Sequence, residues 1–111
     1  MVRIWCAIRP HRLEAVKSAI AALGVSGLNV SDVRGVGNSP ERSSWFGGEH
    51  VVSLPLKSKL EVVAPDDLRT SIIEAIVENA FTGEPGDGKI FVEPILDAVR
   101  IRTKERGEVA V

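Results

Sequence analysis

Residues 65–92 of this 111-residue chain have the sequence PDDLRTSIIEAIVENAFTGEPGDGKIFV, in which a helical pattern leads through a glycine-rich loop into a strand. Pro65 followed by Asp66-Asp67 is typical of a helix start, where acids cap free N–H groups and meet the positive end of the dipole. The apolar positions after it form one stripe at helical spacing: Leu68, Ile72, Ile73, Ile76, Val77 and Ala80. We therefore expect an amphipathic helix, a loop over Thr82–Gly88 and a strand over Lys89–Val92.

The rest of the chain alternates strand and helix patterns in the same way. We expect a strand over Val2–Ile8 buried on both faces, a helix over His11–Leu23 stopped by Gly24, a strand over Leu28–Arg34, a polar loop over Asn38–Gly48, a long strand over His50–Val63 and, after Pro94, a short final strand over Ala98–Arg102.

This order predicts an α+β fold, a ferredoxin-like βαββαβ sandwich with a short extra C-terminal strand. The length favours one domain spanning residues 1–111, with both helices on one face of a mainly antiparallel sheet. The other face carries Trp5, Val62 and Phe91, and the chain has no further element to cover it. We therefore expect the chain to associate with itself through this open face.

Composition excludes several classes of function. The chain has 14 basic and 15 acidic residues, so its net charge of -1 argues against a general nucleic-acid binder. The single cysteine, Cys6, excludes an internal disulfide, and His11 and His50 have no companions at metal-ligand spacing, so no metal site built from side chains is expected. No signal peptide, membrane helix or nucleophile motif is visible, which predicts a cytoplasmic protein that is not an enzyme.

The segment Thr82–Lys89 carries the clearest chemical pattern. Its glycines allow backbone N–H groups to converge on an anion, and Lys89 adds a positive charge, although the spacing is not that of a Walker loop. Arg100 and Arg102, two apart on a strand, would lie on one face and form a triple-positive cluster with Lys89. The alternatives stay open: an ordinary turn for the loop, and for the arginines a solvated strand end paired with Asp97 or Glu105.

From Arg3 to Thr103 the chain resembles the PII signal-transduction family. The motifs that carry the resemblance are Ile8-Arg9-Pro10, Gly24–Leu28, Gly35-Val36-Gly37, Pro65-Asp66-Asp67, Thr82-Gly83 with Gly86–Phe91, and Val99–Thr103. The resemblance implies a ferredoxin-like homotrimer with adenine nucleotides bound in the clefts between subunits, where ATP and ADP compete. It also implies a loop that reports the bound nucleotide to a metabolic enzyme, a transcription regulator or a membrane transporter.

Three regions of the chain take roles from the resemblance: a signalling loop over about 37–56, a nucleotide loop over 82–89 and a C-terminal segment over 97–111. The phosphates would be held by Gly86, Asp87, Gly88, Lys89, Arg100 and Arg102. Gly35, Val36, Gly37 and Asn38 would line the site, and Asn29, Glu61 and Val63 would lie near the adenine. Whether Mg²⁺ accompanies ATP stays open.

The chain departs from the family pattern in its signalling loop. Ser39 replaces the glutamine that helps to bind Mg²⁺ and 2-oxoglutarate, while Lys57 keeps the lysine that meets the oxoglutarate carboxylate. His50 stands where many members carry a uridylylated tyrosine, and the chain has no tyrosine, so that modification is not expected.

Further departures from the family pattern concern charge and the partner. Glu84 replaces a frequent lysine, which lowers the positive charge beside the phosphates. Trp45 and Phe46 are either an apolar anchor for a partner or fold back onto their own trimer.

The leading hypothesis is a regulator that reads ATP against ADP, with a small carboxylate as a second effector, and controls nitrogen or carbon metabolism. One alternative is a divergent regulator of inorganic carbon that binds ADP or AMP together with bicarbonate. A more remote one is an RNA-recognition domain, which shares the element order but needs aromatic stacking platforms, for which Phe91 is the clear candidate. Slow ATP hydrolysis in the nucleotide sites stays open.

Overall fold

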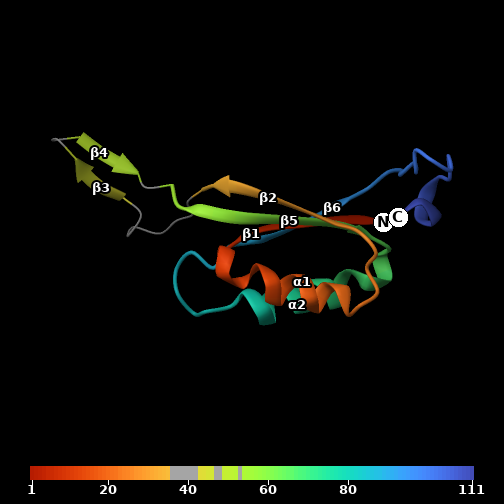
Figure 1. Cartoon of the computed structure of the whole chain (residues 1–111), viewed down its shortest axis with the longest axis horizontal. Coiled ribbons are helices and arrows are strands. Elements are labelled where there is room, and N and C mark those ends of the chain that lie inside the picture. Colours follow the sequence, from red (N-terminus) through yellow and green to blue (C-terminus); the bar gives the residue numbers. More distant parts are fainter. Residues whose placement is uncertain (36–42, 47–48, 53) are drawn as a thin grey trace.

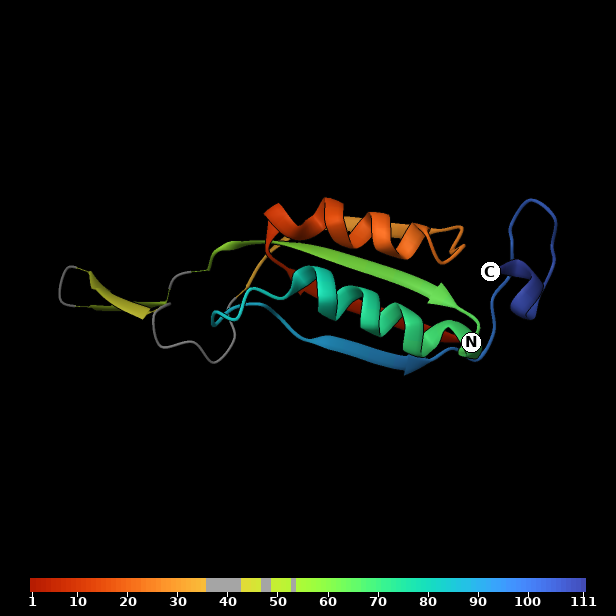
Figure 2. The ribbon, with the colours of Figure 1, turned by 90° about the horizontal axis from the view of Figure 1, so that it is seen from below.

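The computed structural model describes residues 1–35, 43–46, 49–52 and 54–111 (Figure 1). Its main unit is an antiparallel sheet in the order β2-β5-β1-β6, formed by β1 (Val2–Ile8), β2 (Leu28–Arg34), β5 (Leu56–Ala64) and β6 (Ile90–Pro94). Helices α1 (Leu13–Ala21) and α2 (Arg69–Ala80) lie side by side over one face of this sheet (Figure 2). The expected ferredoxin-like α+β fold is confirmed.

The hydrophobic core lies between the sheet and the two helices. Alternate residues of β1 point into it, with Ile4 and Cys6 fully buried, while the alternating residues Arg3 and Trp5 stay half-buried on the opposite face. The expectation that β1 is buried on both faces is therefore wrong for the single chain. The helices add Val16, Ile20, Ile72, Ile76 and Ala80 to the core.

Both helices begin through a short 3-10 turn: η1 (Pro10–Arg12) before α1 and η3 (Asp66–Leu68) before α2. Helix α1 is therefore shorter than the expected span, and Gly24 follows it with a positive φ of 83°. Asp66 does not cap α2 through its side chain as expected. Its carboxylate instead pairs with the N-terminal amine of Met1 at 3.1 Å, because β1 starts beside this end of the helix.

The middle of the chain forms a second, two-stranded sheet from β3 (Ser43–Phe46) and β4 (Glu49–Val52). Strand β3 lies where a polar loop was expected. Figure 1 shows this hairpin standing away from the main sheet. The long strand expected over His50–Val63 is divided between β4 and β5, with Pro55 before β5. Proline has no N–H to donate to a ladder, which explains why β5 begins only after it.

The C-terminal residues do not form the expected strand over Ala98–Arg102. The segment pairs with itself: Val99 bridges to Arg106, the N–H of Arg100 donates to the carbonyl of Glu105 at 2.9 Å, and residues 101–103 form a turn. Asp97 accepts two hydrogen bonds from the Arg106 guanidinium, which lower the pKa of Asp97. The short 3-10 helix η4 (Gly107–Ala110) follows.

The sheet face away from the helices carries a polar and aromatic network. Arg3 donates to Glu61 at 2.7 Å and to Glu93 at 2.8 Å, and the Trp5 ring stacks on Phe91 with 4.6 Å between centroids. The Lys59 ammonium lies 4.9 Å from the centre of the Trp5 ring. Val62, expected on this face, is buried on the helix side instead, because its partners in the register, Ile4 and Leu28, share that side.

Candidate functional site

The loop Thr82–Lys89 joins α2 to β6 and is shaped by three glycines. Gly83, Gly86 and Gly88 have positive φ values of 89°, 99° and 105°, a region that residues with a side chain rarely adopt. Gly88 also lies against β1, since a Cβ at this position would come within 2.3 Å of the Ala7 carbonyl oxygen. The glycine spacing noted in the sequence is therefore required by the backbone path of the loop.

Asp87 holds the loop together from inside. Its carboxylate accepts hydrogen bonds from the N–H of Thr82 at 2.8 Å, the N–H of Gly83 at 3.0 Å and the hydroxyl of Thr82. Arg9 adds a fourth donor at 3.1 Å. These donors, the Thr82 hydroxyl first, lower the pKa of Asp87 well below its ordinary value and keep it ionised. A negatively charged carboxylate whose oxygens already accept these hydrogen bonds cannot bind phosphate. Asp87 can therefore contribute only its backbone N–H to an anion.

The outer side of the loop faces a cavity of about 540 Å³, which Trp5, Ala7, Gly35, Lys57, Glu84, Gly86, Asp87, Gly88, Lys89 and Phe91 line. Within the described residues, the N–H groups of Gly86, Gly88 and Lys89 donate to no acceptor, and the Lys89 ammonium makes no ion pair. Lys57 is 8% exposed and donates to the Gly86 carbonyl at 2.6 Å. Free N–H groups, a lysine and small residues make this cavity suitable for an anion.

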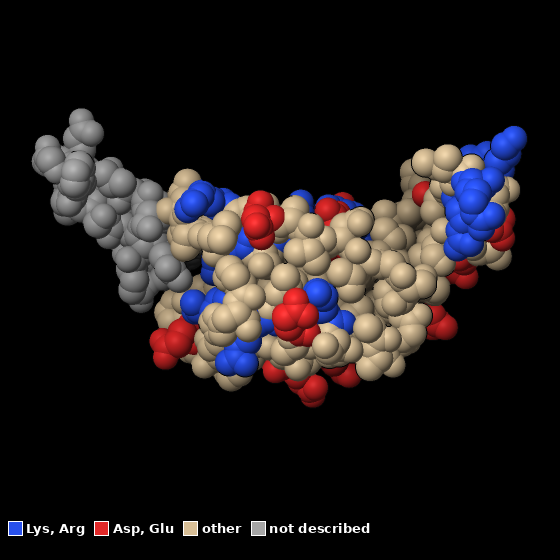
Figure 3. Space-filling model, in the orientation of Figure 1, with Lys and Arg blue, Asp and Glu red and all other residues tan. Residues whose placement is uncertain are grey.

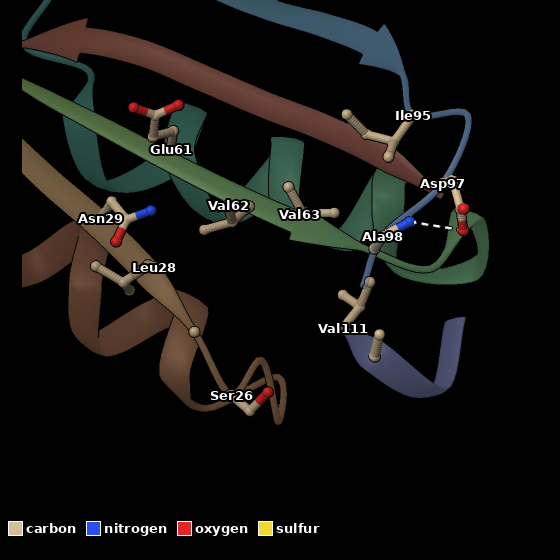
Figure 4. A pocket seen from close by; sticks show the side chains of 12 residues that line it. Ser26, Leu28, Asn29, Glu61, Val62, Val63, Ile95, Asp97, Ala98 and Val111 are labelled. Carbon is tan, nitrogen blue, oxygen red and sulfur yellow. Dashed lines mark hydrogen bonds between the residues drawn. The ribbon is translucent and has the colours of Figure 1, made fainter. Parts of the chain in front are cut away.

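A second cavity, of about 470 Å³, lies where β2 and β5 meet the C-terminal segment (Figure 4). It brings together Asn29, Glu61 and Val63, three residues expected near an adenine, with Ile95, Asp97, Ala98 and Val111. Glu61 is held by Arg3, as described above, so its carboxylate is not free. Aliphatic side chains and one exposed amide make this cavity suited to a flat ring with polar edges.

The two cavities lie at opposite ends of the molecule. The loop Thr82–Lys89, cyan in Figures 1 and 2, is at the end where β2 leaves the sheet, and the blue C-terminal segment is at the other end. Arg100 and Arg102 are exposed on that segment, where Figure 3 shows Lys and Arg side chains gathered. Arg100 lies 3.6 Å from Glu105, one of the two partners expected for the arginines. Within one chain, therefore, the triple-positive cluster with Lys89 does not form.

Sequence reasoning missed Arg9. Arg9 belongs to the motif Ile8-Arg9-Pro10, but its partner is 78 positions away, so no local pattern points to its contact with the loop. Val36, Gly37, Asn38 and Ser39 lie outside the described residues, as do the side chains of Trp45, Phe46 and His50.

Metal binding and membrane crossing can both be judged for the described part of the chain. In residues 1–35, 43–46, 49–52 and 54–111, no group of three or more His, Cys, Asp or Glu side chains is placed to hold a metal ion. Over the same ranges no helix has the length and apolar character that crossing a membrane requires.

Comparison with known proteins adds an independent observation. Residues 1–105 match the family model described as nitrogen regulatory protein P-II. The chain is 43% identical over 112 residues to nitrogen regulatory protein P-II of Haemophilus influenzae, with both chains covered in full. It is 45% identical over 112 residues to nitrogen regulatory protein P-II 1 of Methanothermobacter thermautotrophicus, covering 100% of this chain and 97% of that protein.

Proposed function

The chain belongs to the nitrogen regulatory protein P-II family, and from this premise we propose that it senses adenine nucleotides at sites shared between copies of itself. The observation that carries the proposal is the separation of the two half-sites. The loop with Lys89 can hold phosphates. At the far end of the same chain lie the cavity with Asn29 and Val63 and, on the C-terminal segment, the two arginines. Together they make one nucleotide site only when the loop end of one copy meets the C-terminal end of the next.

A head-to-tail contact of this kind forms a closed ring when its rotation closes, and a homotrimer follows from the PII resemblance. The apolar surface left on the single chain supports such an assembly. Leu96 is fully exposed, at 100%, and Ile101 is 93% exposed, while the Trp5–Phe91 stack lies on the sheet face that no helix covers. Side chains of this size are stabilised by burial against another subunit.

In the ring, Arg100 and Arg102 of one copy would meet phosphates that lie on the loop of its neighbour. Planar guanidinium groups pair well with phosphate oxygens, and Lys89 supplies a point charge from the other side. ATP and ADP would compete for the site, and the difference in phosphate charge would reach the signalling loop over about 37–56 through Gly35, which lines the same cavity as Lys89. The protein thus acts as a regulator.

The signalling loop carries the output to a metabolic enzyme, a transcription regulator or a membrane transporter. The β3–β4 hairpin stands away from the main sheet, which leaves its strand edges accessible to a partner (Figure 1). Trp45 and Phe46 belong to β3, and we place the apolar anchor for the partner there.

The second effector is a small carboxylate or bicarbonate that binds near Lys57 and Ser39. Lys57 lines the loop cavity beside Gly86, so an anion bound there would lie next to the phosphates. Titration of 2-oxoglutarate and of bicarbonate, each in the presence of ATP, ADP and AMP, separates the two forms of the proposal. A gain in affinity with bicarbonate and ADP or AMP favours the inorganic-carbon regulator, and one with 2-oxoglutarate and ATP favours the nitrogen regulator.

Calorimetry on the purified oligomer tests nucleotide binding. Lys89→Ala and Arg100→Ala should each weaken binding of ATP and ADP by about 10-fold or more, the usual effect of losing a hydrogen bond to a charged group. Lys17→Ala on α1 and Arg69→Ala on α2 are matched controls that remove the same charge far from the loop, and they should leave both affinities unchanged. Unchanged affinity in both site variants, or no binding by the wild type, would refute the proposed site.

A further inference from the structure

Arg9 is bound to the loop Thr82–Lys89 at several points. Its side chain is 19% exposed and leaves the end of β1 directly before Pro10. The Nε atom donates to Asp87 at 3.1 Å, and Nη2 donates to the Pro85 carbonyl at 2.7 Å and, at 3.5 Å, to the Glu84 carbonyl. One guanidinium therefore holds three parts of the loop against the central strand.

The charge of Asp87 explains why this contact matters for an anion. The carboxylate is ionised and lies in the loop whose outer N–H groups face the cavity. An uncompensated negative charge at this position would repel phosphate through a partly buried, poorly screened path. Arg9 is the cation that the structure pairs with Asp87 and offsets its charge, so that Glu84 is the one carboxylate of the loop without this compensation.

We propose that Arg9 is a positioning residue for anion binding, which acts through Asp87 by fixing the loop and neutralising its internal carboxylate. The inference rests on the proposed function, because it assumes that the loop receives phosphate. Arg9 contacts two carbonyl oxygens of the loop and is not among the residues that line the loop cavity, so its proposed effect on the anion is indirect. Lys57 holds the same loop from β5 by donating to the Gly86 carbonyl, and this contact does not involve Arg9.

The test compares Arg9→Met, Arg9→Lys and the double variant Arg9→Met/Asp87→Asn with the wild type, with Arg69→Met as the matched control on the exposed start of α2. Calorimetry with ATP and with inorganic pyrophosphate gives the affinity. Amide hydrogen exchange at Thr82 and Gly83, which donate to Asp87, gives the order of the loop without any ligand. Urea denaturation shows that each variant is folded.

We expect Arg9→Met to lower both affinities by about 10-fold or more, the usual effect of leaving a charged group without its partner, and to speed exchange at the two amides. Arg9→Lys should restore part of the affinity, because an ammonium can pair with Asp87 but cannot also reach the Pro85 carbonyl. Arg9→Met/Asp87→Asn should bind more tightly than Arg9→Met, since asparagine keeps an acceptor oxygen without the charge. A purely structural arginine predicts the opposite order, with the double variant the weakest.

The inference would be overturned by wild-type affinity in Arg9→Met, or by a double variant that binds no better than Arg9→Met. Unchanged amide exchange in Arg9→Met would overturn it as well. Failure of the proposed function looks different, because the wild type itself would then bind neither ATP nor pyrophosphate. In that case faster exchange at Thr82 and Gly83 would still support Arg9 as the residue that orders the loop.

Discussion

We expect Gly88→Ala to destabilise the loop strongly, because two separate energetic costs arise at this residue. Its φ of +105° is unfavourable for a side chain, and a Cβ would lie 2.3 Å from the Ala7 carbonyl oxygen. A left-handed backbone costs an L-residue about 1–2 kcal/mol. Ala7 belongs to β1, which pairs with β5 on one side and β6 on the other, so its carbonyl cannot move without loosening the sheet.

Relief of such a clash adds about 1–3 kcal/mol on the scale of strained backbone positions. We therefore expect Gly88→Ala to lower the free energy of unfolding by about 3 kcal/mol in total. Gly24→Ala is the matched control, since Gly24 has a φ of +83° and a Cβ added there would have no neighbour within 4 Å. It should cost about 1 kcal/mol, from the backbone alone.

Urea denaturation at one fixed chain concentration, followed by far-UV circular dichroism, measures both free energies. Equal m-values in the wild type and the two variants would show that the same surface is exposed on unfolding. Equal destabilisation by Gly88→Ala and Gly24→Ala would refute the reasoning, because the Ala7 contact would then carry no cost.

Two further predictions concern titratable groups. Because the folded pKa of Asp87 is lowered, its ionised carboxylate stabilises the fold at pH values above the ordinary carboxyl pKa, and this contribution is lost as the pH falls through the lowered pKa. Asp87→Asn should therefore make the free energy of unfolding less sensitive to acid. An unchanged dependence of that free energy on pH in the acid range would contradict this. Burial raises the pKa of Cys6 to about 11. A thiol reagent at a pH of about 8, below that pKa, should therefore modify Cys6 in the native protein only as fast as the protein unfolds. Rapid modification without urea would contradict this, because it would show that this core position of β1 is accessible to the reagent.

Local patterns in the sequence were sufficient for the elements whose partners are near in the chain. The apolar stripe ending at Ala80 predicts α2, and the alternation in Leu28–Arg34 predicts β2 with its bounds. Gly24 was expected to stop the first helix, and α1 ends at Ala21, shortly before it. In each case the structure is decided by burial of one face of the helix or strand against the core, and the residues that form this face are close together in the sequence.

Patterns failed where a distant partner or self-pairing decides the conformation. Residues 43–46 were expected in a polar loop, yet they form β3 by pairing with β4, which propensity alone does not reveal. Ala98–Arg102 has the composition of a strand, but the Val99–Arg106 bridge and the Asp97–Arg106 ion pair close the segment on itself.

The candidate site shows the same division. The glycines of the loop and Lys89 were visible as an anion-binding pattern, because the whole pattern fits within the single segment Thr82–Lys89. The contact of Arg9 with Asp87 was not visible, nor was the placement of Arg100 at the end of the molecule opposite to Lys89. Both depend on the order of the strands in the sheet, which no pattern of neighbouring residues indicates.

Each nucleotide site, in the function proposed above, is shared by two copies of the chain. Lys89→Ala removes the loop half and Arg100→Ala removes the other half, so neither homo-oligomer should hold a complete site. When the two variants are unfolded together and refolded as a mixture, every mixed ring regains one site with both halves intact, or about one quarter of all sites in random trimers. We expect calorimetry to show wild-type affinity for ATP at that fraction of sites, and none when the variants are refolded separately and then combined. A co-refolded mixture that binds no better than the separate variants would contradict the shared site.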